Sequence, residues 1–155
     1  MTLDDVLTER IIGCAFKVEN TLGPGFLEKV YENALAHELR KAGISAVQQQ
    51  PIQVHYDGIL VGDFVADLVV EGSVILELKA TKDFTDFYAA QCLNYLKATQ
   101  LSVCLLLNFG RAKLEVRRYE RPGGVFSQDE MPKNISSQDE MPKNISSQDE
   151  GDQRG

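Results

Sequence analysis

The chain has 155 residues, of which 43% are hydrophobic and 25% are charged, and its formal net charge is −7 at pH 7. This length suffices for one domain with a buried core and is too short for two. The acidic balance argues against a polyanionic partner. No apolar run is long enough to span a bilayer, and the polar N-terminus lacks the basic start and apolar stretch of a signal peptide, so we expect a cytoplasmic protein without a membrane partner.

Two amphipathic helices come first. Apolar residues recur at three- and four-residue steps from Leu3 to Leu22, which is the spacing of a helix with one buried face. Gly23 ends this helix, and Pro24 opens a second one, because proline is tolerated in the first turn of a helix. The second apolar stripe covers residues 25–42, and Gly43 ends it as a C-terminal cap.

Three strands follow as a meander. After the polar stretch 48–51, apolar and polar residues alternate over residues 52–56, and Asp57-Gly58 is a hairpin turn signal. A long strand then occupies residues 59–70. The turn Glu71-Gly72 leads into a third strand over residues 73–80, which is rich in strand-forming residues.

One helix and two strands complete the fold. Helical spacing returns over residues 84–99, residues 101–107 suit a strand buried on both faces, and residues 113–119 alternate as an edge strand. A strand that is reached through a helix lies parallel to its neighbour in most proteins. We therefore predict an α/β fold, in the α+β sense, with a mixed sheet, the order ααβββαββ and helices covering the sheet.

The C-terminal part of the chain is repetitive. From Ser127 onward the unit SQDEMPKNIS occurs twice and begins a third time, with seven acidic and three basic residues that carry −4 of the net charge. Such a polar segment cannot bury enough apolar surface to offset the entropy of ordering. We therefore expect a folded domain over residues 1–122, which is close to neutral, and a disordered acidic tail over residues 123–155.

Charged residues stand in two of the predicted strands where a core would not need them. Asp67 interrupts the second strand, and Glu77 and Lys79 close the third, where residues two apart share one face. A two-residue turn would place Leu76 opposite Asp67, whereas a bulge or a longer loop would place Glu77 there. Two converging carboxylates would bind Mg²⁺ or Mn²⁺, and a neighbouring lysine can orient an attacking water. A solvated ion pair at a strand end is the alternative interpretation.

Three segments resemble one enzyme family. The spacing of Asp67, Glu77 and Lys79 resembles the signature of the PD-(D/E)XK nuclease superfamily, without the proline that precedes the first acid. Residues 25–31, GFLEKVY, resemble the GxxExxY proteins of that superfamily. Residues 91–95, QCLNY, match the QxxxY helix motif of its RecB-like and Cas4-like branches. The resemblance covers the chain from about Ile11 to Arg118.

The resemblance implies a restriction-endonuclease-like core and a divalent-metal-dependent nuclease that acts on DNA or RNA, with DNA the expected partner, and a homodimer is a further expectation. The catalytic residues it implies are Asp67, Glu77 and Lys79. The Mg²⁺ or Mn²⁺ ligands it implies are Glu28, Asp67, Glu77 and the backbone carbonyl of Leu78. The resemblance also implies that three residues contact nucleic acid or position active-site groups, namely Gln91, Tyr95 and Tyr31.

Other interpretations of these residues remain open. Glu28 is alternatively a solvated helix carboxylate, and Tyr95 and Tyr31 are alternatively core aromatic residues. Many family members have a Val-His pair where this chain has Val18-Glu19, so metal preference or efficiency can differ. A nuclease fold that serves as an accessory or binding module without turnover is the alternative function.

Three cysteines are far apart and embedded in apolar sequence, namely Cys14, Cys92 and Cys104. Neither a zinc site nor a redox centre is expected, because no CxxC pair is present. We predict that all three are free thiols that pack as small hydrophobic residues.

Overall fold

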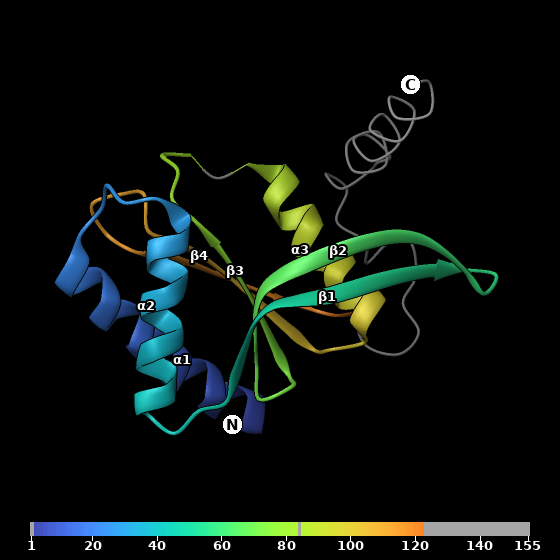
Figure 1. Cartoon of the computed structure of the whole chain (residues 1–155), viewed down its shortest axis with the longest axis horizontal. Helices are drawn as coiled ribbons and strands as arrows, with labels where there is room; N and C mark the ends of the chain where they lie inside the picture. The colour runs from blue at the N-terminus through green and yellow to red at the C-terminus, as the bar shows by residue number, and fades with distance from the viewer. Residues whose placement is uncertain (1, 84, 123–155) are drawn as a thin grey trace.

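The protein is described by a computed structural model that covers residues 2–83 and 85–122 (Figure 1). The predicted tail over residues 123–155 lies outside the described residues. The elements are, in chain order, α1 (Leu3–Leu22), α2 (Glu28–Lys41), β1 (Ala46–Tyr56), β2 (Ile59–Val70), β3 (Val74–Lys79), α3 (Asp86–Thr99), β4 (Val103–Asn108) and β5 (Glu115–Glu120). The predicted order ααβββαββ is confirmed. None of the helices in the described ranges is long and apolar enough to cross a membrane.

The five strands form one mixed sheet in the order β1-β2-β3-β4-β5. Strands β3 and β4 are parallel, with Val74 paired to Val103 and Lys79 paired to Asn108, and the other neighbouring pairs are antiparallel. The crossover through α3 therefore makes the sheet mixed, as predicted. Because β3 and β4 are parallel, their carboxyl ends lie at the same edge of the sheet.

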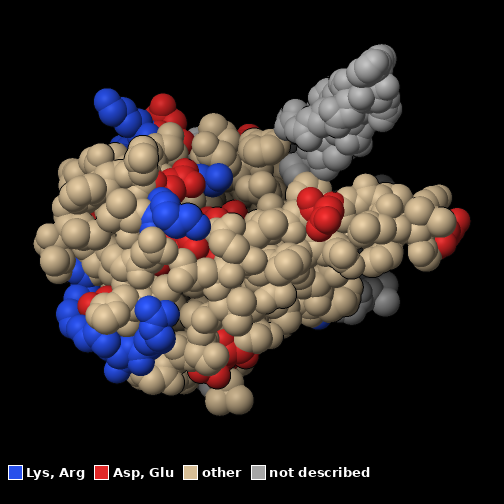
Figure 2. All heavy atoms as spheres, viewed as in Figure 1, with Lys and Arg blue, Asp and Glu red and all other residues tan. Residues whose placement is uncertain are grey.

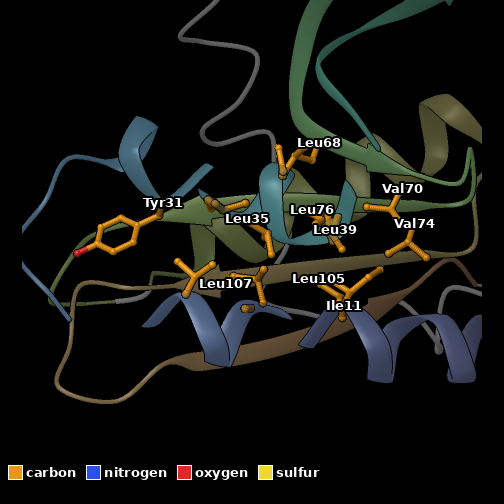
Figure 3. Packing of buried hydrophobic residues seen from close by; sticks show 14 of the residues in the cluster. Ile11, Tyr31, Leu35, Leu39, Leu68, Val70, Val74, Leu76, Leu105 and Leu107 are labelled. Atoms are coloured by element: carbon orange, nitrogen blue, oxygen red, sulfur yellow. The ribbon is translucent and has the colours of Figure 1, made fainter. Parts of the chain in front are cut away.

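Helices cover both faces of the central strands. The side chains of α1 and α2 pack against one face, where Figure 3 shows Ile11, Leu35 and Leu39 directed toward Leu76 and Leu105. Helix α3 covers the other face, on which Ile75 and Leu106 are buried with the helix residue Leu96. Alternate residues of β3 and β4 thus enter two separate cores, as expected for strands that are buried on both sides.

The cysteines have the predicted character. Cys92 and Cys104 are buried in the core beneath α3, Cys14 is half-buried in α1, and all three are free. Burial raises the pKa of the Cys104 thiol, so this thiol stays protonated and inert.

Helix α2 begins at Glu28, later than the proline-initiated start that the sequence predicts. Gly25 has φ +120°, a backbone conformation that residues other than glycine rarely adopt, and Leu27 is the N-cap, with an extended backbone. The hydroxyl of Tyr31 holds this loop together, because it donates to the Gly23 carbonyl at 2.6 Å and accepts from the Phe26 N–H at 3.1 Å. The loop thereby sets where α2 begins.

Strand β1 begins at Ala46 and includes the polar stretch 48–51 that the sequence analysis placed before the strand. Pro51 fits within β1 because this strand lies at the edge of the sheet, where a missing N–H need not break a ladder. The β1–β2 hairpin extends well beyond the rest of the sheet (Figure 1). We call this extension, residues 50–66, the arm.

The ends of β3 and β4 are tied together by Asn108, which is fully buried. Its amide exchanges two hydrogen bonds with the backbone of Thr81, at 2.9 and 3.0 Å, and it also accepts from the Gly110 N–H at 3.0 Å. Gly110 lies so close to Thr81 that a Cβ would collide with the Thr81 backbone nitrogen and oxygen. The turn after β4 is therefore packed directly against the segment that follows Lys79.

We expect Gly110→Ala to destabilise the chain by about 1–3 kcal/mol, because the added methyl group has no room beside the backbone of Thr81. Denaturant-induced unfolding measures this free energy. The matched control is Gly13→Ala on the exposed face of α1, where a Cβ has nothing within 4 Å. That variant should be more stable by about 0.5–1 kcal/mol, because alanine favours helix. Equal effects of the two substitutions would contradict the packing argument.

Candidate active site

Strands β2 and β3 separate after three residue pairs, the last of which joins Leu68 to Leu76. The turn between them contains three residues, 71–73, rather than the two of the shortest hairpin. The same register, continued by one residue, places Glu77 opposite Asp67. Of the two registers that the sequence leaves open, the structure has the one with the longer loop.

Two carboxylates hold the backbone at the point of separation, which we call the fork. The Asp67 N–H donates to Glu77 Oε2 at 3.1 Å, and the Leu78 N–H donates to Asp67 Oδ2 at 2.8 Å. Backbone N–H groups in a protein interior need acceptors, and here side chains take the place of the missing strand partner. The structure thus brings Asp67 and Glu77 together.

The surroundings of both carboxyl groups disfavour their negatively charged forms. Glu77 is only 4% exposed, and burial, followed by the neighbouring charge of Asp67, raises its pKa to about 8. Burial also raises the pKa of Asp67, to which the negative charges of Glu32 and Glu28 contribute. A proton or a cation that binds to such a site stabilises it.

Lys79 is the nearest cation in the sequence and follows Glu77 on the same side of β3. Its positive charge opposes the rise in pKa at both Asp67 and Glu77. The Lys79 ammonium lies 4.6 Å from the ring centroid of Tyr88 in α3, which is a cation–π distance. The contact with the aromatic ring therefore restricts where the ammonium lies.

Glu28 occupies the first turn of α2 and is exposed. Its charge is close enough to raise the pKa of both Asp67 and Glu77. Within residues 2–83 and 85–122, however, no three His, Cys, Asp or Glu side chains are grouped as a metal site would need. The structure therefore brings two of the expected carboxylate ligands together and leaves Glu28 nearby. Leu78 lies between Glu77 and Lys79 on β3, where its carbonyl remains a predicted ligand.

Glu32 is a residue of this region that the sequence analysis did not identify. It is only 4% exposed, and it accepts hydrogen bonds from Gln48 at 2.7 Å, Gln49 at 2.9 Å and Lys29 at 3.1 Å. Gln49 has φ +55° and lies in β1 next to the residues that pair with Leu68 and Ala66. The sequence feature that could have identified Glu32 is its spacing, because it follows Glu28 by four residues and so lies on the same face of the helix.

The two α3 residues of the QxxxY motif are in contact. The Gln91 side chain donates to the Tyr95 hydroxyl at 3.2 Å. Burial, followed by the negative charges of Glu77 and Asp67, raises the pKa of Tyr95. The phenol therefore stays protonated and can donate a hydrogen bond.

Tyr31 lies in the core rather than at the surface. It is fully buried, and its ring stacks on Phe109 with the centroids 4.6 Å apart. Together with its hydroxyl contacts to the loop before α2, this packing makes Tyr31 a support for the end of the helix that presents Glu28.

Charged side chains of both signs occur near the fork. Figure 2 shows acidic and basic residues together on the face where α2, β3 and α3 meet in Figure 1. In the same view, most of the arm is neither acidic nor basic. On this face, the charged side chains are thus unevenly distributed between the arm and the rest of the chain.

In the metal-free chain, Glu77 should make the free energy of unfolding fall as pH rises. Between its ordinary pKa of 4.5 and its folded pKa of about 8, the folded chain keeps a proton that the unfolded chain has lost. Linkage then lowers the stability by up to about 1.4 kcal/mol per pH unit across that window. Glu77→Gln should remove this decline, which denaturant unfolding at several pH values will measure. Glu9→Gln, at an exposed position of α1, is the control, and an unchanged decline in Glu77→Gln would contradict the assignment.

Comparisons with known proteins agree with this architecture. A sequence profile described as the PD-(D/E)XK nuclease superfamily matches residues 5–119. The crystal structure of SSO0001 is similar with a TM-score of 0.50 and 13% identity, over 61% of this chain and 50% of that one. The alkaline exonuclease LHK-Exo from Laribacter hongkongensis has a TM-score of 0.46 and 14% identity, over 61% of this chain and 56% of that one.

These matches differ in what they cover. The matched region amounts to about half the length of either solved structure, and at such low identity the likeness to SSO0001 concerns the fold alone. The search of curated proteins gave no significant match. The profile, in contrast, spans α1 to β5 and includes the fork. This chain therefore belongs to the PD-(D/E)XK nuclease superfamily.

Proposed function

We propose that the chain is a divalent-metal-dependent nuclease that hydrolyses phosphodiester bonds in nucleic acid, with DNA as the expected substrate. The observation on which this proposal rests is the pair of carboxylates at the fork, Asp67 and Glu77, with Lys79 on the same strand. The pair occurs in a chain of a nuclease superfamily. The pair lies at the end of the β2–β3 pairing, one residue beyond the Leu68–Leu76 pair.

The donor atoms at the fork fit Mg²⁺ or Mn²⁺. Both ions prefer oxygen ligands. Burial, followed by the charge of Asp67, raises the pKa of Glu77 to about 8, so a divalent cation that displaces the proton would stabilise the carboxylate form. Asp67, Glu77 and the Leu78 carbonyl would hold the ion, with Glu28 as a further ligand. The chemistry that such an ion supplies is neutralisation of charge on the scissile phosphate and a lower pKa for a water molecule.

The remaining steps belong to side chains of this chain. The Lys79 ammonium, held beside the Tyr88 ring, would orient the attacking water and stabilise the negative charge that develops on the phosphate oxygens. The hydrogen bond from the Leu78 N–H fixes the orientation of the Asp67 carboxylate. Tyr95, which stays protonated, would donate a hydrogen bond to the substrate from the α3 side, with Gln91 orienting its hydroxyl.

A second candidate function is a nuclease-fold binding module without turnover. Two observations favour it: only two carboxylates converge among the described residues, and the chain has an acidic net charge of −7. A protein of this kind would bind nucleic acid or a partner protein through the same face. Metal binding and cleavage distinguish the two functions.

Lys79→Ala should lower Mg²⁺-dependent cleavage by roughly 100-fold or more, because loss of one preorganised stabilising group has about that effect on turnover. The measurement is cleavage of labelled DNA and RNA oligonucleotides, with folding checked by circular dichroism. The matched control is Lys41→Ala, at the opposite end of α2 from Glu28, where Lys41 pairs with Glu38. Full activity in purified Lys79→Ala would contradict the proposed role.

Calorimetric titration with Mn²⁺ should show saturable binding to the chain and loss of that binding in Asp67→Asn. The reason is that the amide cannot supply an anionic ligand to the ion. Asp63→Asn is the matched control, since Asp63 lies on the same strand but is exposed on the arm. Absence of saturable binding by the unchanged chain would favour the binding module over the nuclease.

A further inference from the structure

A cavity of about 650 Å³ lies between the arm and α3. Its apolar wall includes Val61 and Phe64 from the arm and Ala98 from α3, and polar side chains border it, namely Gln53, Asn94 and Lys97. Small-molecule sites commonly have volumes of about 300–1,000 Å³, with mostly apolar walls and a few polar groups that fix orientation. The cavity therefore has the size and composition of a site for a ligand of nucleoside size.

Tyr95 joins this cavity to the fork. Its ring lines the cavity and lies 5.8 Å, centroid to centroid, from the ring of Phe64 in a tilted arrangement. The charges of Glu77 and Asp67 act on the same phenol strongly enough to contribute to its raised pKa. Glu77 lies two residues after Ile75 and so projects to the same face of β3, where Ile75 is buried in one core with Tyr95. The carboxylate pair and the cavity are therefore on the same face of the sheet, the face that α3 covers.

The side chains around the cavity match the chemistry of an unpaired base. Aromatic rings stack on bases, and side-chain amides such as those of Gln53 and Asn94 can both donate to and accept from a base edge. Among the described residues that line the cavity, Lys97 is the charged one, and its cation suits the phosphate attached to that nucleotide. A purely apolar occupant would leave both Lys97 and the amides without a matching group.

We propose that this cavity binds one unpaired base of the nucleic-acid strand, adjacent to the phosphate held at the Asp67–Glu77 pair. The proposal rests on the proposed nuclease function and extends it to the substrate, which must be single-stranded or locally opened at the cleavage site. The arm then has a function of its own, because with α3 it forms the walls of the base site.

The test measures binding of short single-stranded DNA at low ionic strength with Ca²⁺ present, because a divalent cation at the Asp67–Glu77 pair offsets the charge that would repel the strand. Gel electrophoresis of the recovered strand checks that it is uncleaved, so that the readout is binding alone. An oligonucleotide that has lost one base, at each position in turn, is compared with the intact strand. We expect one position at which base loss weakens binding about 5- to 100-fold, the range for loss of one stacked base. A 2-aminopurine placed at that position should lose fluorescence on binding, and the chain has no tryptophan to interfere.

Two variants assign that position to the cavity. Ala98→Leu should fill the space and weaken binding of the intact strand by the same factor, so that base loss no longer matters. The matched control is Ala42→Leu, at the exposed C-cap of α2, which should bind as the unchanged chain does. Lys97→Ala should weaken intact and base-depleted strands alike and reduce the salt dependence of binding by about one phosphate contact.

The outcomes separate this proposal from the nuclease proposal. The base site is overturned by equal binding at every base-loss position, by persistence of the effect in Ala98→Leu, or by failure of every oligonucleotide to bind. None of these outcomes requires cleavage to be absent. Conversely, a chain that binds the base but shows no metal-dependent cleavage retains the base site and loses the nuclease assignment.

Discussion

The structure depends on the replacement of strand pairing by carboxylate–backbone contacts at the fork. Three residue pairs join β2 to β3, and beyond them Asp67 and Glu77 accept the backbone N–H groups that a continuing ladder would satisfy. This exchange lets β2 leave the sheet together with β1, forming the arm, while β3 continues beside β4. Glu77 is buried at this point, and the arm that leaves the sheet here forms one wall of the cavity beside α3. One local change in hydrogen bonding thus accounts for the carboxylate pair, the arm and the proposed base site.

The electrostatic cost of this arrangement explains how an acidic chain can bind a polyanion. Glu77 is buried beside Asp67 with its pKa raised to about 8, and Glu28 and Glu32 add negative charge nearby. A divalent cation at the pair offsets two negative charges at the place where a phosphate would otherwise be repelled. The net charge of −7 also includes the repetitive C-terminal segment, so it describes the electrostatics of the fork poorly. Local charge, not the total, determines whether the site and a phosphate attract each other.

Periodicity and topology rules predict the helices and strands of this fold well. They do not predict the register at Asp67, the start of β1 or the burial of Glu32, which depend on the turn before β3 and on tertiary contacts. The parallel β3–β4 pair follows from the crossover rule, and the order of elements follows from the apolar spacing. The register at Asp67 depends on a single residue in the turn before β3, which composition does not determine. Strand β1 includes the glutamine stretch, where the side chains of Gln48 and Gln49 donate hydrogen bonds to Glu32 of α2. Glu32 is buried through that contact with β1. The helical pattern of the sequence alone would place a glutamate at this position on the exposed face, so sequence reasoning missed it.

The residues around the fork divide into two physical roles. Asp67, Glu77 and Lys79 project near one another and can take part in chemistry, whereas Tyr31, Asn108 and Gly110 hold the elements that present them. Tyr31 stacks on Phe109 and fixes the loop before α2, and Asn108 ties the end of β4 to Thr81, just after Lys79. Gly110 permits that close approach because any side chain there would meet the Thr81 backbone. Some of these residues are therefore needed for the geometry of the fork, and others for its chemistry. The contacts in the structure show which residues have which role.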